Sequence, residues 1–227
     1  MVLHWVQLSA NDSKNKYMSL IAIDFSINST AICIQHDQGL EWFNFVSNLN
    51  LERKPYSIHK ELVDSSQNVH VIGYERNKPK DLDYSDEQSW KIANANCLSY
   101  TIMNTIAPYI DEESIFAFEG YSYGSKGNSF IDLITYNTFL KSKILRVCQN
   151  DIRVLAPKSV KKDFTGNGNA GKPMMLKSFI ERKDTLLKKD AVHNYCSSFG
   201  DFGEKVPKPL DDLVDAFAIL KYMEQRL

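Results

Sequence analysis

The stretch Leu20-Ile21-Ala22-Ile23-Asp24 consists of four apolar residues followed by a carboxylate. Ile115-Phe116-Ala117-Phe118-Glu119 repeats the pattern in the middle of the chain. Short apolar runs of this kind are typical of buried β-strands. A carboxylate in such a strand costs free energy unless it is paired, hydrogen-bonded or bound to a cation. Two such strands therefore predict that Asp24 and Glu119 lie together at a functional site.

The residues around these two strands indicate a mixed α/β fold. Apolar runs predict three sequential antiparallel strands at Met18–Ser26, Thr30–His36 and Leu40–Val46, followed by strands at Ser114–Glu119 and Ile152–Leu155. Val69–Tyr74 is a candidate for a further short strand outside this set of five. Apolar residues spaced three or four apart predict a helix from Glu87 to about Pro108 and further helices beyond Pro157. A second helix between them is predicted to carry Phe130, Leu133, Leu140, Ile144 and Val147. This order predicts a mixed five-stranded sheet with helices on both faces.

The C-terminal segment adds two more candidate acids. Leu210, Leu213, Val214, Phe217 and Leu220 form an apolar helical stripe, and Asp212 and Asp215 are helix-surface neighbours because they are three residues apart. One alternative is that Asp211 and Asp212 only stabilise the positive end of the helix dipole. That alternative explains Asp215 poorly, because Asp215 lies deeper in the helix.

If these acids converge, they require cations. Several carboxylates do not stay ionised side by side without positive charge, and hard oxygen ligands favour Mg²⁺, with Mn²⁺ as a substitute. Two ions about 4 Å apart would stabilise the attacking and leaving oxygens of a phosphoryl displacement, with water as the nucleophile. Convergence of Asp24, Glu119, Asp212 and Asp215 would therefore provide for two ions per active site.

Four motifs in order make the sequence resemble RuvC-type Holliday junction resolvases, which have the RNase H-like fold. They are Ile23-Asp24-Phe25-Ser26 with Thr30-Ala31, Phe118-Glu119-Gly120, Val160-Lys161-Lys162 with the loop Thr165-Gly166-Asn167-Gly168-Asn169-Ala170-Gly171-Lys172, and Asp212-Leu213-Val214-Asp215-Ala216. Each motif is weakly specific alone, but together they span residues 20–220. The resemblance implies a homodimer that nicks two strands of a four-way or branched DNA, with the same four acids as catalytic metal ligands.

The resemblance also implies DNA contacts. Lys161 and Lys172 would contact phosphates near the cleaved bond, and the glycine-rich loop, including Gly166 and Gly168, would let the backbone approach DNA closely. Tyr121 or Tyr123 would stack on an unpaired base, and Lys126 lies in the same segment. The alternatives are a plain turn between helices for the loop and packing against a neighbouring helix for the tyrosines.

Composition is compatible with this class of protein but does not select it. The 227 residues carry a net charge of −1, 43% are hydrophobic, and a locally basic stretch runs from Lys141 to Lys162. The four cysteines form no Cys-x-x-Cys pair, which argues against a zinc site and suits a reducing compartment. With neither a signal peptide nor a membrane span evident, we expect a cytoplasmic protein, located in the host cytoplasm if the gene is viral.

Domain organisation and rival functions complete these expectations. Residues 1–17 are predicted to be an N-terminal extension and 18–227 a single nuclease domain with an insertion at about 47–86. Gly166–Lys172 also matches a nucleotide phosphate loop, but Pro173 replaces the Ser or Thr that would hold Mg²⁺, so no nucleotide cofactor is expected. The alternatives to a junction resolvase are a related nuclease for flaps, forks or other branched DNA, and a non-catalytic junction-binding relative.

Overall fold

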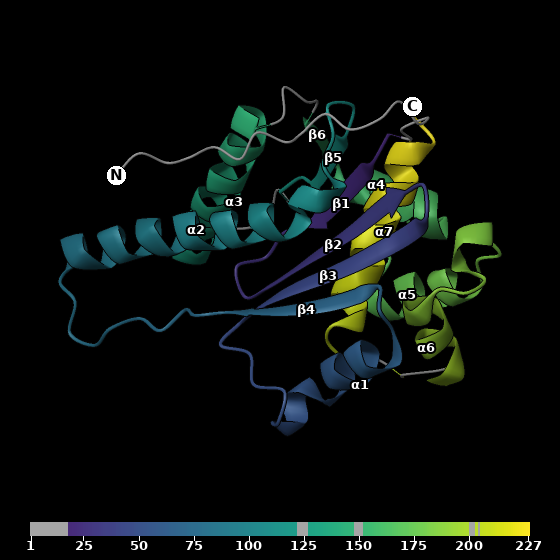
Figure 1. Cartoon of the computed structure of the whole chain (residues 1–227), viewed down its shortest axis with the longest axis horizontal. Helices are drawn as coiled ribbons and strands as arrows, with labels where there is room; N and C mark the ends of the chain where they lie inside the picture. Colours follow the sequence, from purple (N-terminus) through teal and green to yellow (C-terminus); the bar gives the residue numbers. More distant parts are fainter. Residues whose placement is uncertain (1–17, 122–126, 148–151, 200–202, 204) are drawn as a thin grey trace.

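A central six-stranded sheet organises the computed structural model, which describes residues 18–121, 127–147, 152–199, 203 and 205–227. The strand order is β4-β3-β2-β1-β5-β6 (Figure 1). The strands are β1 (Leu20–Asp24), β2 (Ser29–His36), β3 (Gly39–Ser47), β4 (Val69–Tyr74), β5 (Ile115–Glu119) and β6 (Ile152–Leu155).

The pairing of the strands confirms the predicted mixed sheet. Strands β1, β2 and β3 are antiparallel neighbours, whereas β5 runs parallel to β1 and β6 runs parallel to β5. The predicted number of five strands is wrong, because β4 adds a sixth strand parallel to β3. This strand lies between 47 and 86, where the hydrophobic pattern is weak.

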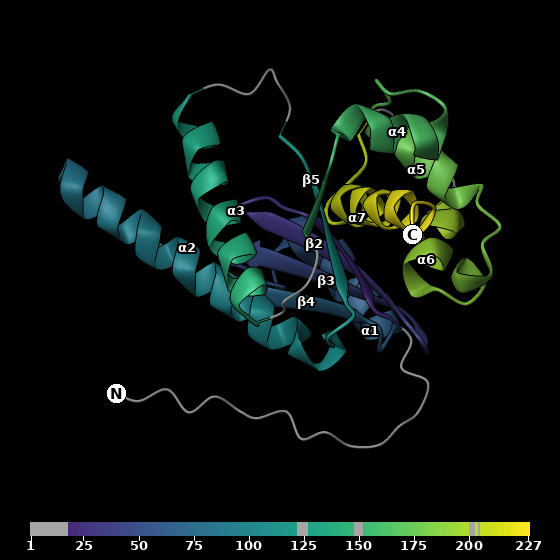
Figure 2. The same ribbon diagram turned by 90° about the horizontal axis from the view of Figure 1, so that it is seen from above.

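Helices cover both faces of the sheet, as predicted. Figure 2 shows α2 and α3 on one side and α7 with α4, α5 and α6 on the other. The α-helices are α1 (Ser57–Ser65), α2 (Tyr84–Ile106), α3 (Asn128–Val147), α4 (Pro157–Thr165), α5 (Lys172–Ile180), α6 (Ala191–Phe199) and α7 (Leu210–Glu224). Short 3₁₀ helices lie at Lys54–Tyr56, Ala107–Tyr109 and Thr185–Leu187.

The sheet separates two hydrophobic cores, and the alternation of side chains in a strand decides which core each residue joins. In β1, Leu20 and Ala22 belong to the core beneath α7, whereas Ile21 and Ile23 belong to the core beneath α2 and α3. The same alternation puts Ala117 of β5 beneath α7. Because Asp24 and Glu119 follow Ala22 and Ala117 by two residues, both acids lie on the α7 face of the sheet.

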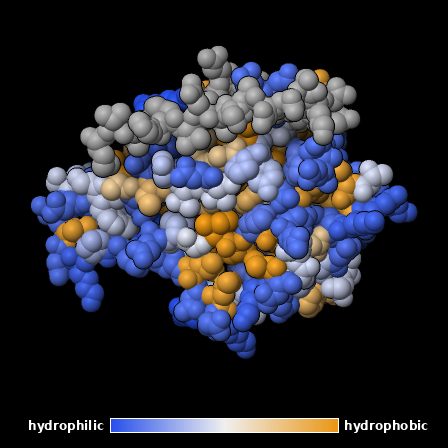
Figure 3. Space-filling view, in the orientation of Figure 1, coloured by the Kyte–Doolittle hydropathy of each residue, from blue (hydrophilic) through white to orange (hydrophobic). Residues whose placement is uncertain are grey.

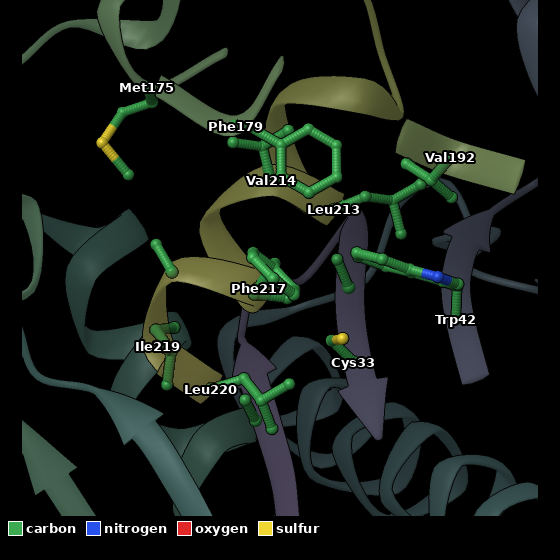
Figure 4. Close-up of a cluster of buried hydrophobic side chains, with 14 of the residues drawn as sticks. Cys33, Trp42, Met175, Phe179, Val192, Leu213, Val214, Phe217, Ile219 and Leu220 are labelled. Carbon is green, nitrogen blue, oxygen red and sulfur yellow. The ribbon is translucent and has the colours of Figure 1, made fainter. Parts of the chain in front are cut away.

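Helix α7 forms the centre of the larger core (Figure 4). The Phe217 ring stacks on Trp42 of β3, with 5.9 Å between ring centroids, and contacts Phe179 of α5 edge-on at 5.2 Å. Helix α7 contacts β1, β2, β3 and β5 as well as α4 and α5. This packing holds the first turns of α7 against the sheet.

The surface is largely hydrophilic in the view of Figure 3, with an apolar patch over the region of β4. Strand β4 is an edge strand of the sheet, and Val71 and Ile72 are half-buried. Nowhere in the described residues is a helix both long and apolar enough to cross a membrane.

Candidate active site

Two acids meet where β1 and β5 end. The strands are parallel and in register, with Ile23 opposite Phe118, so that Asp24 and Glu119 follow directly as the last residues of neighbouring strands. Both side chains are half-buried. The C-terminal ends of parallel strands are where α/β folds commonly place their ligand sites.

Three more acids face this strand end from the first turns of α7. Asp211, Asp212 and Asp215 are 9%, 4% and 8% exposed, so all three are buried although each is ionisable. Charged groups are rarely buried to this degree unless they have partners. We refer to Asp24, Glu119, Asp211, Asp212 and Asp215 as the acidic cluster. Capping of the helix alone does not account for three buried acids.

Two lysines neutralise part of the acidic cluster. Lys172, the first residue of α5, forms an ion pair with Asp215, and its Nζ lies 3.7 Å from Asp211 Oδ2. Lys208, just before α7, forms an ion pair with Asp212, and its Nζ lies 3.0 Å from Asp211 Oδ2. The sequence analysis expected Lys172 near the reacting phosphate, and the structure places it beside the acids.

A hydrogen-bonded chain of polar residues fixes Asp212 from the sheet side. Ser29 Oγ, at the start of β2, donates to Asp212 Oδ2 at 2.7 Å. Asn44 Nδ2 of β3 donates to Ser29 Oγ at 3.2 Å and to the carbonyl oxygen of Thr30 at 3.3 Å. Ser29 and Asn44 therefore orient one carboxylate of the cluster.

The acids raise one another's affinity for protons. Burial raises the pKa of Asp24 well above its usual value, and the charges of Asp215, Asp212 and Glu119 raise it further, while Lys172 opposes them. Burial and Asp215 likewise raise the pKa of Glu119. Burial and Asp211 raise the pKa of Asp212 against the effect of Lys208. These shifts show a concentration of negative charge that favours bound cations.

The negative charge of the acidic cluster also raises the pKa of Lys172 and of Lys208. Burial lowers the pKa of Lys172, but the attraction of Asp215, Asp24 and Asp211 outweighs it, so the pKa lies above its usual value. The pKa of Lys208 is also raised, because Asp212 and Asp211 outweigh the effect of burial. Both ammonium groups are therefore firmly charged at neutral pH.

The donor set of the acidic cluster fits a hard divalent cation. All five groups offer carboxylate oxygens, the ligand type that Mg²⁺ and Mn²⁺ prefer. Asp211 Oδ1 and Asp215 Oδ1 are buried and find no hydrogen-bond partner in the part of the chain that the structure describes. Within the same residues, no three acid, histidine or cysteine side chains lie close enough together to hold an ion. Lys172 and Lys208 contact three of the five carboxylates that would serve as ligands.

A pocket of about 270 Å³ opens beside Asp24 and Glu119. Lys161 of α4 lines this pocket, and its charge opposes the rise in the Glu119 pKa. Tyr121 also lines it, while the Tyr121 ring packs edge-on against Phe130 of α3 at 5.5 Å. Tyr121 thus packs on a helix and also lines the pocket. Packing against a helix is therefore compatible with the predicted stacking of Tyr121 on a base. We refer to this cavity as the strand-end pocket.

The glycine-rich loop joins α4 to α5, and its backbone geometry requires glycine at two positions. Gly166 ends α4 with a positive φ of 80°, a conformation that glycine adopts without strain. A Cβ atom on Gly168 would lie 2.9 Å from the Lys158 carbonyl oxygen, so this position has no room for a side chain. The loop follows a helix rather than a strand, as expected, and it leads directly into Lys172.

Most of the predicted site residues converge on one end of the sheet. Asp24, Glu119, Asp212, Asp215, Lys161, Lys172 and Tyr121 do so, whereas Tyr123 and Lys126 lie outside the described residues. Sequence reasoning missed Lys208, Ser29 and Asn44, and it considered Asp211 only for capping. The spacing of Lys208, three and four residues before the acids, was the available indication for that lysine.

Comparison with known proteins yields similar solved structures only. No family model and no curated relative matches this sequence. The structure of Thermus thermophilus RuvC is similar over 92% of this chain and 96% of its own, with 10% identity and a TM-score of 0.49. The structure of T. thermophilus RuvC in complex with a Holliday junction substrate is similar over 90% of this chain and 90% of its own, with 9% identity and a TM-score of 0.43.

The yeast mitochondrial Holliday junction resolvase Ydc2 is similar over 92% of this chain and 84% of its own, with 15% identity and a TM-score of 0.47. The strand order found here has an antiparallel β3-β2-β1 followed by parallel β5 and β6. The fold is therefore the predicted mixed α/β architecture, with helices on both faces of the sheet.

Proposed function

We propose that this protein is a metal-dependent endonuclease that resolves Holliday junctions and other branched DNA. The observation that carries the proposal is the meeting of Asp24 and Glu119 with the buried acids of α7, beside Lys161 and Lys172. Acids that repel one another at this cost indicate a functional site rather than a structural one. Lysines next to such acids suit an anionic substrate.

In the proposed mechanism, Asp24, Glu119, Asp212 and Asp215 would hold two Mg²⁺ ions, for which Mn²⁺ would substitute. When bound, such ions supply Lewis acidity and an activated water for hydrolysis of a phosphodiester. Ser29 and Asn44 keep the Asp212 carboxylate oriented. Lys161 attracts the substrate phosphate to the mouth of the strand-end pocket, and Lys172 moves from the carboxylates to the phosphate. Cleavage would leave a 5′-phosphate and a 3′-hydroxyl.

The choice of substrate and the assembly rest on the motifs that resemble RuvC-type resolvases. Such an enzyme would act as a homodimer and place two active sites on the two strands to be nicked. A related nuclease that cuts flaps or forks would use the same acids, and a non-catalytic junction-binding relative would not need them. Three buried and two half-buried acids, held together against repulsion, favour a catalytic protein.

A nicking assay tests the proposal. A labelled immobile four-way junction, a fork, a flap and a linear duplex are incubated with the protein in Mg²⁺, in Mn²⁺ and in chelator. We expect paired, symmetric, metal-dependent nicks in the junction. Equal cutting of forks and flaps would move the substrate class to branched DNA in general, and absence of cleavage with either ion would contradict a nuclease.

The variant Asp24→Asn assigns the chemistry to the acidic cluster. It removes one negative charge from the cluster without changing the size of the side chain, so we expect cleavage to fall at least a hundredfold while junction affinity stays within about threefold. Asp81→Asn, in an exposed loop far along the chain from the cluster, is the matched control and should cut normally. Normal cutting by Asp24→Asn would show that the assigned role is wrong.

A further inference from the structure

The strand-end pocket extends past the acidic cluster toward α3. Besides Asp24 and Glu119, it is lined by Phe25, Tyr121 and Pro157 and by Leu133 and Asn137 of α3, which are four residues apart on one helix face. Its volume of about 270 Å³ is close to the lower limit, about 300 Å³, of pockets that hold small organic ligands. Two metal ions and a phosphate do not require these apolar walls.

Asn137 is the unexplained group in this pocket. The residue is only 2% exposed, and its Oδ1 has no hydrogen-bond partner among the described residues. A buried amide oxygen without a partner destabilises a folded protein, and apolar residues of similar size would fill the position at lower cost. An amide retained here at such a cost indicates a ligand that completes its hydrogen bonds.

The chemistry of the lining selects a flat, partly polar ligand. Phe25 and Tyr121 offer aromatic rings, on which bases stack, while Leu133 and Pro157 offer apolar contact. The Asn137 Oδ1 presents an unpartnered acceptor, which matches the donor groups on the polar edges of nucleobases. Lys141 lies over the Tyr121 ring, with its Nζ 5.5 Å from the ring centroid, and helps to fix the ring in place.

We infer that the strand-end pocket binds one unpaired nucleobase of the cleaved strand, next to the phosphate held at the acidic cluster, and that Asn137 hydrogen-bonds its edge. This inference rests on the proposed nuclease function and adds a determinant of the cleavage position to it. Because the acids and the amide line one pocket, the bound base sets which phosphate reaches Asp24 and Glu119. Asn137 thereby contributes to sequence preference.

Fluorescence of a base analogue tests the inference without cleavage. The Asp24→Asn protein is bound, in chelator, to junctions that carry 2-aminopurine at each successive position around the branch point. We expect a change in fluorescence of about twofold or more at one position, with loss of that change when Asn137→Leu is added. Gln35→Leu is the matched control, because Gln35 also has an unpartnered buried amide oxygen but pairs with Leu20 at the other end of β1.

Two further readouts separate recognition from folding. Asn137→Leu removes the unpartnered amide oxygen, so we expect its melting temperature to rise by a few degrees. With randomised junctions in Mg²⁺, we expect its cleavage positions to lose sequence preference, whereas Gln35→Leu keeps the wild-type pattern. A lower melting temperature of Asn137→Leu would show a structural amide and overturn the inference.

An unchanged fluorescence profile or cleavage pattern in Asn137→Leu would also overturn the inference, while leaving the nuclease function intact. Failure of the proposed function looks different. In that case the wild-type protein cuts no DNA with Mg²⁺ or Mn²⁺, whatever residue 137 is. A fluorescence change that depends on Asn137 would then still support the base pocket, and absence of DNA binding would overturn both proposals.

Discussion

At the scale of single residues, the carboxylates of the acidic cluster repel one another and are partly withdrawn from water. Asp24 lies at the end of a buried strand, and burial together with Asp215 and Asp212 raises its pKa. A carboxyl whose pKa is raised by folding binds its proton more tightly in the folded state than in the unfolded state. Its effect on folding stability therefore improves as the pH falls through the raised pKa, and is lost as the pH rises through it.

Replacement of Asp24 by Asn should consequently stabilise the metal-free protein at neutral pH. Asn removes the repelled charge, so we expect the melting temperature at pH 7.5 in chelator to rise by roughly 2–6 °C, or about 1–2 kcal/mol. The gain should shrink as the pH is lowered through the raised pKa, because the wild-type carboxyl then also becomes neutral. Thermal unfolding of both proteins between pH 7.5 and 5 measures this, and a gain independent of pH would contradict the electrostatic cause.

The sequence predicted some of these residues and not others for a physical reason. Asp24 and Glu119 stand out because each interrupts an apolar run, and Asp215 because helix capping does not explain it. Lys208, Ser29 and Asn137 do not stand out in this way, since none of them interrupts an apolar run. Their roles depend on contacts between distant parts of the chain, such as Ser29 with Asp212, which only the fold brings about.

At the scale of elements, α7 combines two tasks. Its first turns carry three acids, and its middle packs against the sheet through Phe217, which contacts Trp42, Phe179 and Phe164. The sequence predicted this helix and most of the strands because their periodicity is strong. It missed β4 as a full member of the sheet, because Val69–Tyr74 is short and lies in an otherwise irregular segment.

Truncation of Phe217 should affect stability and activity together. Phe217→Ala removes a fully buried ring, so we expect a loss of about 3–5 kcal/mol in the free energy of unfolding and weaker cleavage at temperatures where the wild type is active. Urea unfolding followed by circular dichroism measures the loss. Ile131→Ala, at a position 62% exposed on α3, is the control and should change stability by less than about 0.5 kcal/mol.

At the scale of the whole molecule, the ion pairs of Lys172 and Lys208 join α5 and the segment before α7 to the acidic cluster. Both lysines contact the buried acids and offset much of their charge. We therefore expect protein treated with chelator to keep its circular dichroism spectrum and a cooperative thermal transition. Added Mg²⁺ should raise the melting temperature with concentration, because a ligand that binds only the folded state stabilises it.

The same titration of Asp215→Asn serves as the comparison for this expectation. Loss of one candidate ligand should weaken the stabilisation by Mg²⁺, so that a higher concentration is needed for the same rise. A wild-type protein that unfolds in chelator would show that the lysines do not compensate the acids. A Mg²⁺ effect of equal size in both proteins would place the bound ion elsewhere.

The position of α7 in the chain has a consequence for synthesis on the ribosome. Helix α7 is the last element of the described fold, yet β1, β2 and β3 near the start bury one face against it. Until the residues after Leu210 emerge, that face of the nascent sheet has no central helix to cover it, and three of the five acids are missing. For the nuclease that we propose, protein cut short before α7 would therefore neither compete stably for DNA nor keep partial activity, and early stop codons should behave genetically as complete loss of function.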